Sequence, residues 1–569
     1  MTNTRVRADN LVGLLLFLGT FIVYIKTLCP TVPPRDSAEL ITVAYTLGIA
    51  HPPGYPLFTL LGKLFTFIPF GSIAWRVNLL SAFFASLTVW LTYLISLKLT
   101  RNIIAGVLSA LALAFSLFFW KLAVVAEVFQ LNAFFAALLI YIIIIWAEKR
   151  EIRFLYLFSF IYGLGLTNHH TLILLAPGFA YYVWVNDRTV FFKLGNWGIM
   201  AGCFALGLLP YIYLPIRSLQ NPYIDWGNPE NLKNFINVVT RKQYGGMRLD
   251  PNFKNMPFSN PFVQVKVFVY WIYQNFTILG LVAGILGIIK NIRNNIRVFG
   301  FLISVFLMTG LAFMLLANYP LERELFYPYI TAILGRFMLP ALLIFAIWIG
   351  IGVTCVSNKK AALLFLIIPL LSLTLHYKEA DRSRYYFAED VLNNIFLSIK
   401  PNSILFASGD TTLFGCWYMQ QVRGVRKDIK VISSKQYDWR AAQILKRWPN
   451  LTKRKIDSYK SEYEFIDDII KNNLNKARVY SDLYQPYKFK KYGKHLAPNG
   501  LIFEFITNPS RQAKKRHMLK NNYLWGQYRF KSPLSTANPN DYFSVEIVDY
   551  YKMAKMISGR LTTPSVPRP

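Results

Sequence analysis

Apolar runs of roughly 20 residues, the length that lets a helix cross a bilayer, recur through the first two thirds of this chain. Short polar turns separate them. We predict about eleven spanning helices, at residues 11–29, 78–98, 103–120, 124–147, 154–167, 169–186, 196–216, 268–289, 298–317, 337–357 and 361–376. The fifth is short and runs into TNHH, so it either stops early or joins the sixth as a broken helix. The first is too long for a signal peptide and has no A-x-A site after it, which indicates an uncleaved span.

Basic residues fall on one side of these predicted spans. With the N-terminus inside, every short inside segment is basic, as the positive-inside rule requires. These residues are Arg5 and Arg7; Lys98 and Arg101; Lys149, Arg150 and Arg153; Arg188 and Lys193; Lys290, Arg293 and Arg297; Lys359 and Lys360. The same orientation places residues 30–77, 217–267 and 318–336 outside. We expect a multi-pass protein of a bacterial inner membrane, or of the ER membrane in a eukaryote, with its function on the periplasmic or lumenal face.

The last third of the chain reads as a water-soluble region. Strand-like segments NSILFASGD, DIKVISS, ARVYSD and GLIFEFIT alternate with helical ones such as TTLFGCWYMQQV. This alternation favours a small α/β domain. The sequence therefore predicts a transmembrane domain over residues 1–376 and an outer α/β domain over residues 377–569.

The amino-acid composition is typical of a membrane protein and limits the kinds of molecule that the chain is expected to bind. The chain is 54% hydrophobic and carries a formal net charge of +33. In such a chain, the excess of Lys and Arg indicates basic inside loops and contact with anionic lipid headgroups rather than binding to nucleic acid. No zinc-finger spacing or RNA-binding signature is present, and the four cysteines form no CxxC pair. We therefore expect the lipid bilayer as a partner, and neither nucleic acid, nor a metal, nor a cofactor.

The first outer loop concentrates ionisable side chains. RDSAEL holds Asp36 and Glu39, and AHPPGYPLF holds His51 and Tyr55 in a rigid, proline-rich turn. The two acids fit a capping box at the start of a helix. They also fit chemistry, because a glycosyl transfer needs a carboxylate to accept the proton of the attacking hydroxyl. Both interpretations stay open on the sequence alone. His51 is either a surface or N-cap-like residue, or it forms a hydrogen bond to a phosphate or an acceptor.

Further candidates flank the predicted spans at their outer ends. Glu127 shares a helix face with Gln130, and adjacent His169 and His170 lack the i, i+4 spacing of a metal pair. Arginines suit a phosphate and an indole face suits a sugar ring. These expectations fall on Arg217, Trp226, Arg241 and Arg336. Packing for Trp226 and snorkelling for Arg336 are the alternatives.

Several motifs in one order resemble a known family. They are RDSAELITVAYTLGIAHPPGYPLFTLLGKLF, WRVNLLSAFFA, AEVFQLNA, GLTNHHT, PYIYLPIRS, DWGNPENLKNF and VTRKQYG, followed by ILFASGDTTLFGCWYMQQVRGVRKDIKVIS. Together they are similar to the transmembrane protein O-mannosyltransferase-like family, long catalogued as a domain of unknown function. Its animal members look like lumenal enzymes that act on immunoglobulin-like domains of plexin-type receptors.

The resemblance implies a GT-C glycosyltransferase. Such an enzyme moves a sugar, here mannose, from a polyprenyl-phosphate donor to an acceptor hydroxyl on a protein or glycan, with Asp36 as catalytic acid of the first outer loop and Glu39 as the second acid. The family usually reads Gly-Asp-Ser-Gly-Glu-Leu, whereas this chain has Arg35 and Ala38 in place of the glycines. A transporter or flippase for a lipid-linked or anionic substrate, and a non-catalytic scaffold, are the alternatives.

The predicted orientation can be tested at two positions. We expect residue 420 to lie outside and residue 190 to lie inside, because the basic turns fix the direction of the spans. Reporter fusions that end at residues 420 and 190 should report opposite sides of the membrane. The same side for both fusions would contradict the orientation.

Overall fold

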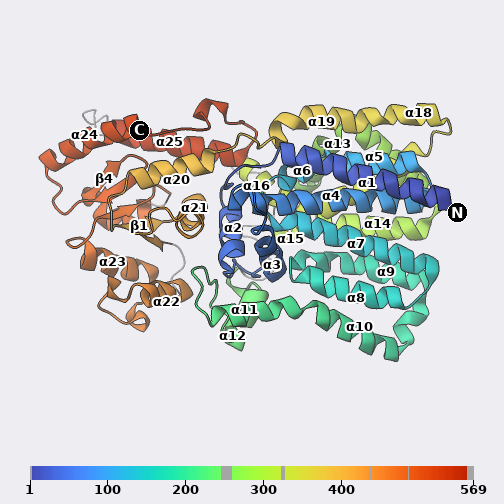
Figure 1. The fold of residues 1–569 in the computed structure, drawn as a ribbon, viewed down its shortest axis with the longest axis horizontal. Coiled ribbons are helices and arrows are strands. Elements are labelled where there is room, and N and C mark those ends of the chain that lie inside the picture. The colour runs from blue at the N-terminus through green and yellow to red at the C-terminus, as the bar shows by residue number, and fades with distance from the viewer. Residues whose placement is uncertain (1–2, 245–258, 322–326, 435–437, 485, 561–569) are drawn as a thin grey trace.

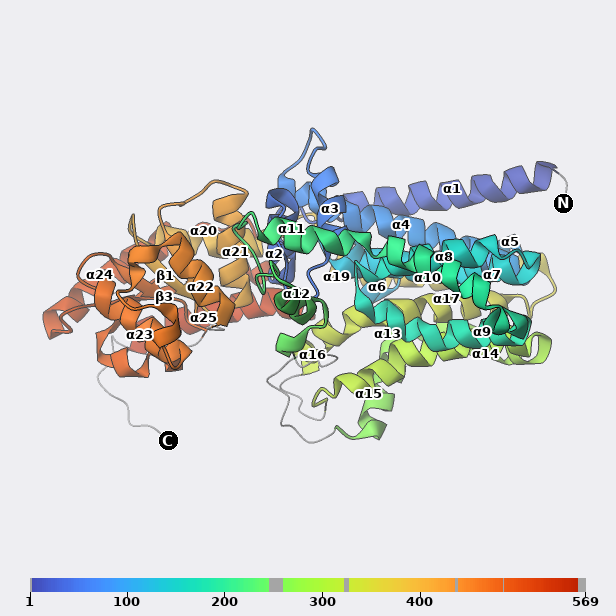
Figure 2. The ribbon, with the colours of Figure 1, turned by 90° about the horizontal axis from the view of Figure 1, so that it is seen from below.

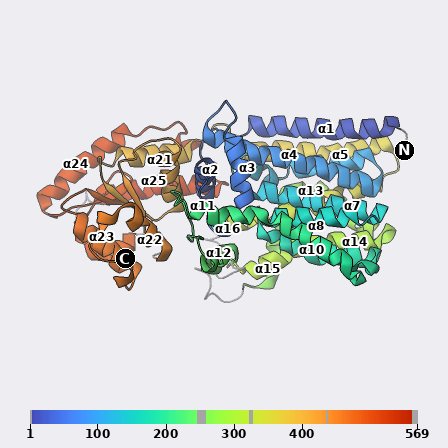
Figure 3. The same ribbon diagram turned by 60° about the horizontal axis from the view of Figure 1, so that its bottom comes forward.

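The structure is a computed structural model that describes residues 3–244, 259–321, 327–434, 438–484 and 486–560. Figure 1 shows a bundle of long helices, with a smaller region that contains the sheet beyond one end of it. The two turned views place helix α2 (Asp36–Thr46) at the junction between bundle and sheet region (Figures 2 and 3). The N-terminus lies at the far end of the bundle (Figure 1).

The bundle is built from helices connected mostly by short turns. α17 (Leu339–Val353) lies at its centre, because all of its side chains are buried. The helices around it are α1 (Asn3–Lys26), α4 (Ile73–Thr100), α5 (Ile103–Ala114), α6 (Leu117–Ala123), α7 (Val128–Lys149), α8 (Arg153–Leu166), α9 (Ala176–Asn186), α10 (Leu194–Gly207), α13 (Pro261–Asn294), α14 (Ile296–Leu307), α15 (Phe313–Ala317), α16 (Tyr327–Leu334), α18 (Lys359–Leu363) and α19 (Ile367–Ala380).

The number of membrane spans differs from the eleven expected. Among the described residues, seven helices are long and apolar enough to cross a membrane, and nine if each bent pair is one span. The predicted span 103–120 is one such pair, bent by 66° between α5 and α6. The predicted fifth and sixth spans are short: α8 has 14 residues, and α9 has 11 after a 3-10 turn at His170–Leu175. The chain is therefore a multi-pass membrane protein, and the count of eleven is not confirmed.

Four short helices lie at the end of the bundle that faces the sheet region. α2 carries the acids of the first loop, and α3 (Pro56–Phe65) follows the proline-rich turn. The loop before α12 (Leu232–Val239) pairs with the turn after α2, through a bridge between Ile49 and Asp225. α11 (Tyr213–Ser218) ends next to this loop. Segments distant in sequence thus meet around α2.

The sheet region has five strands in the order β2-β1-β3-β5-β4. β1 (Ile404–Ala407) pairs in parallel with β2 (Lys430–Ser433) and β3 (Val479–Ser481), while β4 (Leu496–Asn499) and β5 (Ile502–Phe505) form an antiparallel edge. The four predicted strands and the helix α21 (Asp410–Gln421) are confirmed, whereas β4 was not predicted. The remaining helices are α20 (Phe387–Leu397), α22 (Asp438–Arg447), α23 (Glu462–Asn473), α24 (Arg511–Gln527) and α25 (Tyr542–Arg560).

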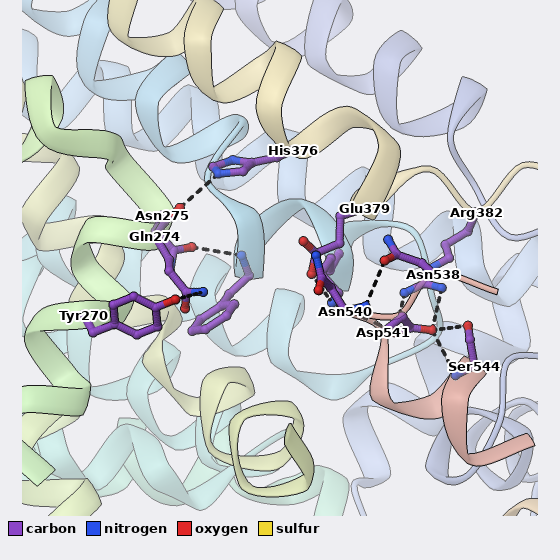
Figure 4. Close-up of polar contacts among 12 residues, drawn as sticks. Tyr270, Gln274, Asn275, His376, Glu379, Arg382, Asn538, Asn540, Asp541 and Ser544 are labelled. Atoms are coloured by element: carbon purple, nitrogen blue, oxygen red, sulfur yellow. Dashed lines mark hydrogen bonds and ion pairs between the residues drawn. The ribbon is translucent and has the colours of Figure 1, made fainter. Parts of the chain in front are cut away.

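Buried ion pairs connect the start of α25 to the bundle. Arg382, just after α19, donates to both carboxylate oxygens of Asp541 at 2.8 and 2.7 Å. Figure 4 shows these two side chains facing each other, with Ser544 on the other side of the carboxylate. Lys121 of α6 donates to Glu379 of α19 at 2.9 Å and lies 4.0 Å from Asp541. A buried charge needs such partners, so this cluster fixes where the sheet region sits.

We expect Asp541→Asn to destabilise the whole chain by about 3 kcal/mol, because it leaves Arg382 buried without its partner. Burial alone raises the pKa of the Asp541 carboxyl, but Arg382 and Lys121 outweigh burial and hold it far below its ordinary value. The stabilisation is therefore present above the unfolded-state pKa and is lost as pH falls through the folded-state pKa. Unfolding in mixed detergent micelles should show the difference at neutral pH and a smaller one in acid. Asp549→Asn, on the exposed face of the same helix, is the control and should change little.

Candidate active site

Asp36 is the first residue of α2, so the capping-box interpretation of the two acids is wrong. The N-cap position belongs to Arg35, and no side chain caps the first turn. The carboxylate of Glu39 is completely buried and turns instead toward the proline-rich loop, where it accepts a bond from the His51 amide at 3.1 Å. The short-range pattern fitted a cap, but a partner twelve residues away holds Glu39 instead. Asp36 is therefore free of a capping role.

One arginine lies between two carboxylates at this helix start. Nη1 of Arg336 is 3.0 Å from Asp36 and 3.2 Å from Glu127. Arg336 belongs to the 3-10 turn Gly335–Met338 that precedes α17, and Glu127 is the N-cap residue of α7. The side chains of Arg336 and Glu127 are only 7% and 6% exposed, whereas that of Asp36 is 31% exposed. Asp36 is thus the most exposed member of the cluster.

The surroundings separate the two carboxyl groups chemically. Burial raises the pKa of Glu127 to about 7, even though Arg336 opposes that rise. Burial also acts on Asp36, but Arg336, His51 and Arg35 together outweigh it and hold its pKa below the ordinary value. At neutral pH Asp36 is therefore ionised, while Glu127 titrates near neutrality. Carboxyl groups whose pKa values are pushed apart in this way commonly divide base and acid roles.

A second cluster of polar side chains lies beside the first. Nδ1 of His51 is 2.5 Å from Glu39, and its Nε2 is 3.2 Å from the Tyr55 hydroxyl. Burial lowers the pKa of His51, but Glu39 and Asp36 outweigh burial and raise it. The imidazole therefore gains positive charge near Asp36. The contacts with Glu39 and Tyr55 fix the orientation of the His51 ring.

A group of aromatic rings packs next to His51. The ring of Tyr55 stacks on His169 at 5.8 Å, and His169 stacks on His170 at 5.1 Å. Nδ1 of His169 accepts a bond from the Thr171 amide at 3.2 Å, so it is engaged within the chain. Among the residues that the structure describes, no three His, Cys, Asp or Glu side chains gather as they would around a metal ion. The two histidines are part of an aromatic surface.

Two of the candidates contact other parts of the chain. Arg217 donates to the carbonyl oxygens of Leu47 and Thr46 at 2.8 and 3.3 Å, so it holds the C-terminal end of α2. Trp226 is 3% exposed and packs between His51 and Phe414 of α21. Both residues thus have contacts within the chain. Their expected contacts with a phosphate and with a sugar face stay predictions. The sequence around Arg217 and Trp226 does not indicate these contacts, because their partners lie far away along the chain.

Arg241 and Arg336 differ in what neutralises them. Arg336 was expected to hold a lipid phosphate, but two carboxylates already occupy its guanidinium. Arg241 is only 9% exposed, and its guanidinium contacts the ring of Tyr244 at 5.0 Å. Among the described residues it has no carboxylate partner, and its Nε donates no bond. A buried, unpaired guanidinium is costly unless an anion joins it.

A pocket of about 430 Å³ opens beside the acidic cluster. Glu127 and Arg336 line it, together with polar side chains of α6, α13 and the α25 start. Figure 4 shows Tyr270 and Gln274 on one side and Arg382 with Asp541 on the other. The sequence reading missed Lys121, Glu379, Arg382 and Asp541. The lone lysine in the apolar run LFFWKLA was the one available signal, since an unpaired charge there is expensive.

Comparisons with known proteins agree with this geometry. The family described as "Protein O-mannosyl-transferase TMEM260 N-terminal domain" matches residues 36–190, and "TMEM260-associated domain 2" matches residues 388–536. Protein O-mannosyl-transferase tmem260 of Dictyostelium discoideum is 28% identical over 474 residues, which cover 75% of this chain and 57% of that protein. The TMEM260 protein of Mus musculus is 28% identical over 463 residues, covering 77% and 64%. This chain thus spans less than two thirds of both relatives.

Solved structures share the fold. ArnT from Cupriavidus metallidurans bound to undecaprenyl phosphate aligns with a TM-score of 0.55 at 8% identity, covering 90% of this chain and 99% of ArnT. The apo form aligns with a TM-score of 0.51 at 10% identity, covering 89% and 99%. The fold defines a multi-pass membrane protein of the GT-C class with an appended sheet region. Within that class, the chain belongs to the TMEM260 protein O-mannosyl-transferase family.

Asp36→Asn separates chemistry from structure at this site. The amide has the same shape and still accepts a bond from Arg336, but it cannot take a proton. We expect turnover to fall by a factor of about 10²–10⁴ in a sugar-transfer assay, while the folded yield stays near normal. Glu39→Gln should cost less, because Glu39 acts by holding His51. Glu230→Gln, in the exposed loop, is the matched control. Near-normal turnover of Asp36→Asn would exclude Asp36 as the base.

Proposed function

We propose that this protein is a membrane glycosyltransferase that moves mannose from a polyprenyl-phosphate donor to a Ser or Thr hydroxyl of a protein. One observation carries the proposal: an ionised, partly accessible carboxylate, Asp36, is held by a buried arginine beside a pocket at the end of the bundle. Family membership and the GT-C fold support the same reaction class. The names of the relatives support mannose and a protein acceptor.

Asp36 acts as the general base in this proposal. The acceptor hydroxyl attacks the anomeric carbon of the sugar, and its proton passes to the Asp36 carboxylate. A new bond forms between the acceptor oxygen and the anomeric carbon, while the bond to the phosphate oxygen breaks. Polyprenyl phosphate leaves with that electron pair. Arg336 keeps Asp36 ionised and fixed, which preserves the geometry that the attack requires.

Glu127 shares Arg336 with Asp36 and lines the pocket. With its pKa raised to about 7 by burial, it can hold a hydrogen bond to a sugar or acceptor hydroxyl in either protonation state. His51 lies nearby, fixed by Glu39 and by the Tyr55 hydroxyl. We assign both residues to substrate positioning, with His169 and His170 as part of the adjoining surface.

Arg241 is the better candidate for the donor phosphate. Among the residues that the structure describes, no carboxylate pairs with its buried guanidinium, whereas Arg336 and Arg217 have protein partners. A phosphate monoester or diester would satisfy it with charge-assisted bonds. The undecaprenyl phosphate bound to ArnT is a donor-type lipid of the same chemistry. We therefore place the phosphate near Arg241 and the sugar toward Asp36.

A donor screen tests the function directly. Purified protein in lipid nanodiscs would be given a panel of polyprenyl-phosphate sugars with and without an acceptor protein. We expect release of polyprenyl phosphate from the mannose donor only, coupled to acceptor labelling, and loss of both with Asp36→Asn. Movement of an intact donor across a vesicle membrane without cleavage would support the transport alternative and contradict the proposal.

Arg241→Gln should weaken donor binding. Losing a charge-assisted contact lowers affinity by roughly 10- to 100-fold. Binding of polyprenyl phosphate, titrated against the purified protein, measures this without any turnover. Lys233→Gln, an exposed cation in the same segment, is the control and should bind as the wild type does. Equal affinities of Arg241→Gln and wild type would remove Arg241 from the donor site.

A further inference from the structure

Arg35 occupies a backbone conformation that side chains with a Cβ rarely adopt. Its φ and ψ are 59° and −130°, a combination suited to glycine. Such residues persist only when the surrounding structure holds them. Arg35 directly precedes Asp36 in the chain. The contacts that fix the Arg35 backbone therefore also set the direction in which the Asp36 side chain points.

The start of α25 supplies that hold. Nε and Nη2 of Arg35 donate to the two carboxylate oxygens of Glu546 at 3.1 and 2.7 Å. Both side chains are only 14% exposed. Asp410 at the start of α21 adds a longer contact at 4.0 Å. A forked, partly buried pair of this kind fixes both position and orientation of the guanidinium.

An aromatic ring from the same turn of α25 lies near both arginines that flank Asp36. The guanidinium carbon of Arg35 lies 5.3 Å from the centre of the Phe543 ring, and that of Arg336 lies 5.2 Å from it. Tyr542 is 5.7 Å from Arg35 and packs edge-on against Tyr329 of α16. These distances are in the range of cation–π attraction.

We infer that the first turn of α25 is a positioning element for the Asp36 site: Glu546 and Phe543 hold Arg35, and through it the backbone that carries Asp36. The same turn lines the pocket with Tyr542 and Phe543. The sheet region therefore acts on the acid at the end of the bundle, beyond its own folding. This inference goes further than the proposed function, and its structural part holds whatever reaction the site performs.

The double-mutant cycle of Arg35→Gly and Glu546→Gln tests the inference. Arg35→Gly keeps the backbone conformation and removes the guanidinium, while Glu546→Gln removes only the partner charge. We expect amide hydrogen exchange at residues 36–40 to become about tenfold faster in each variant, because a charge-assisted pair is lost. Exchange in α17 should stay as in wild type. Asp549→Asn, on the exposed face of α25, is the matched control.

Turnover gives the second readout. We expect each variant to lower kcat by about 10- to 100-fold through misplacement of the acid, with KM for the donor changed little. The double variant should lose no more than Arg35→Gly alone, since both substitutions break one interaction. If Glu546→Gln fails to fold, Arg35→Gly alone carries the test.

Two results would overturn the inference. One is unchanged exchange at residues 36–40 in a folded variant, and the other is additive losses in the cycle. The exchange measurement needs no substrate. Failure of the inference would therefore appear as normal exchange, whereas failure of the proposed function would appear as absent turnover with exchange altered as expected.

Discussion

The guanidinium of Arg336 between Asp36 and Glu127 is the constraint on which the site depends. Two carboxylates that contact the same guanidinium would repel each other without it, so the cation is what allows both to ionise. The two carboxyl groups differ in charge state. Arg336 and the neighbouring His51 favour the charged form of Asp36, whereas burial keeps the pKa of Glu127 near 7. The result is one ionised, partly exposed acid and one acid with a raised pKa that lines the pocket.

The three residues come from separate parts of the chain, so the packing of the bundle creates the site. Asp36 begins α2, Glu127 precedes α7, and Arg336 precedes α17. The bend between α5 and α6 places Lys121 on the same pocket, where Glu379 holds it. The ion pair between Asp541 and Arg382 attaches the sheet region to this end of the bundle. Bundle and sheet region thus form one structural unit at this end of the molecule.

Much of the fold could be predicted from the sequence, because apolar runs and strand patterns are local signals. The four predicted strands and α21 follow from alternation over a few residues. The count of eleven spans is not confirmed where helices are bent or short, as at α5–α6 and α8, since an apolar run does not reveal a break. At the site, Asp36 and Glu127 stood out as acids beside spans. Their shared partner, 300 residues from Asp36, is a product of tertiary packing, and so are the contacts of Arg217 and Trp226.

A structure of the Asp36→Asn variant with a bound polyprenyl-phosphate mannose would test the central claim most directly. The substitution should trap the donor before transfer. The account predicts that the phosphate lies against Arg241 and that the anomeric carbon faces residue 36, with space for an acceptor oxygen about 3–3.5 Å away. A sugar bound away from residue 36, with its phosphate elsewhere in the bundle, would contradict the account.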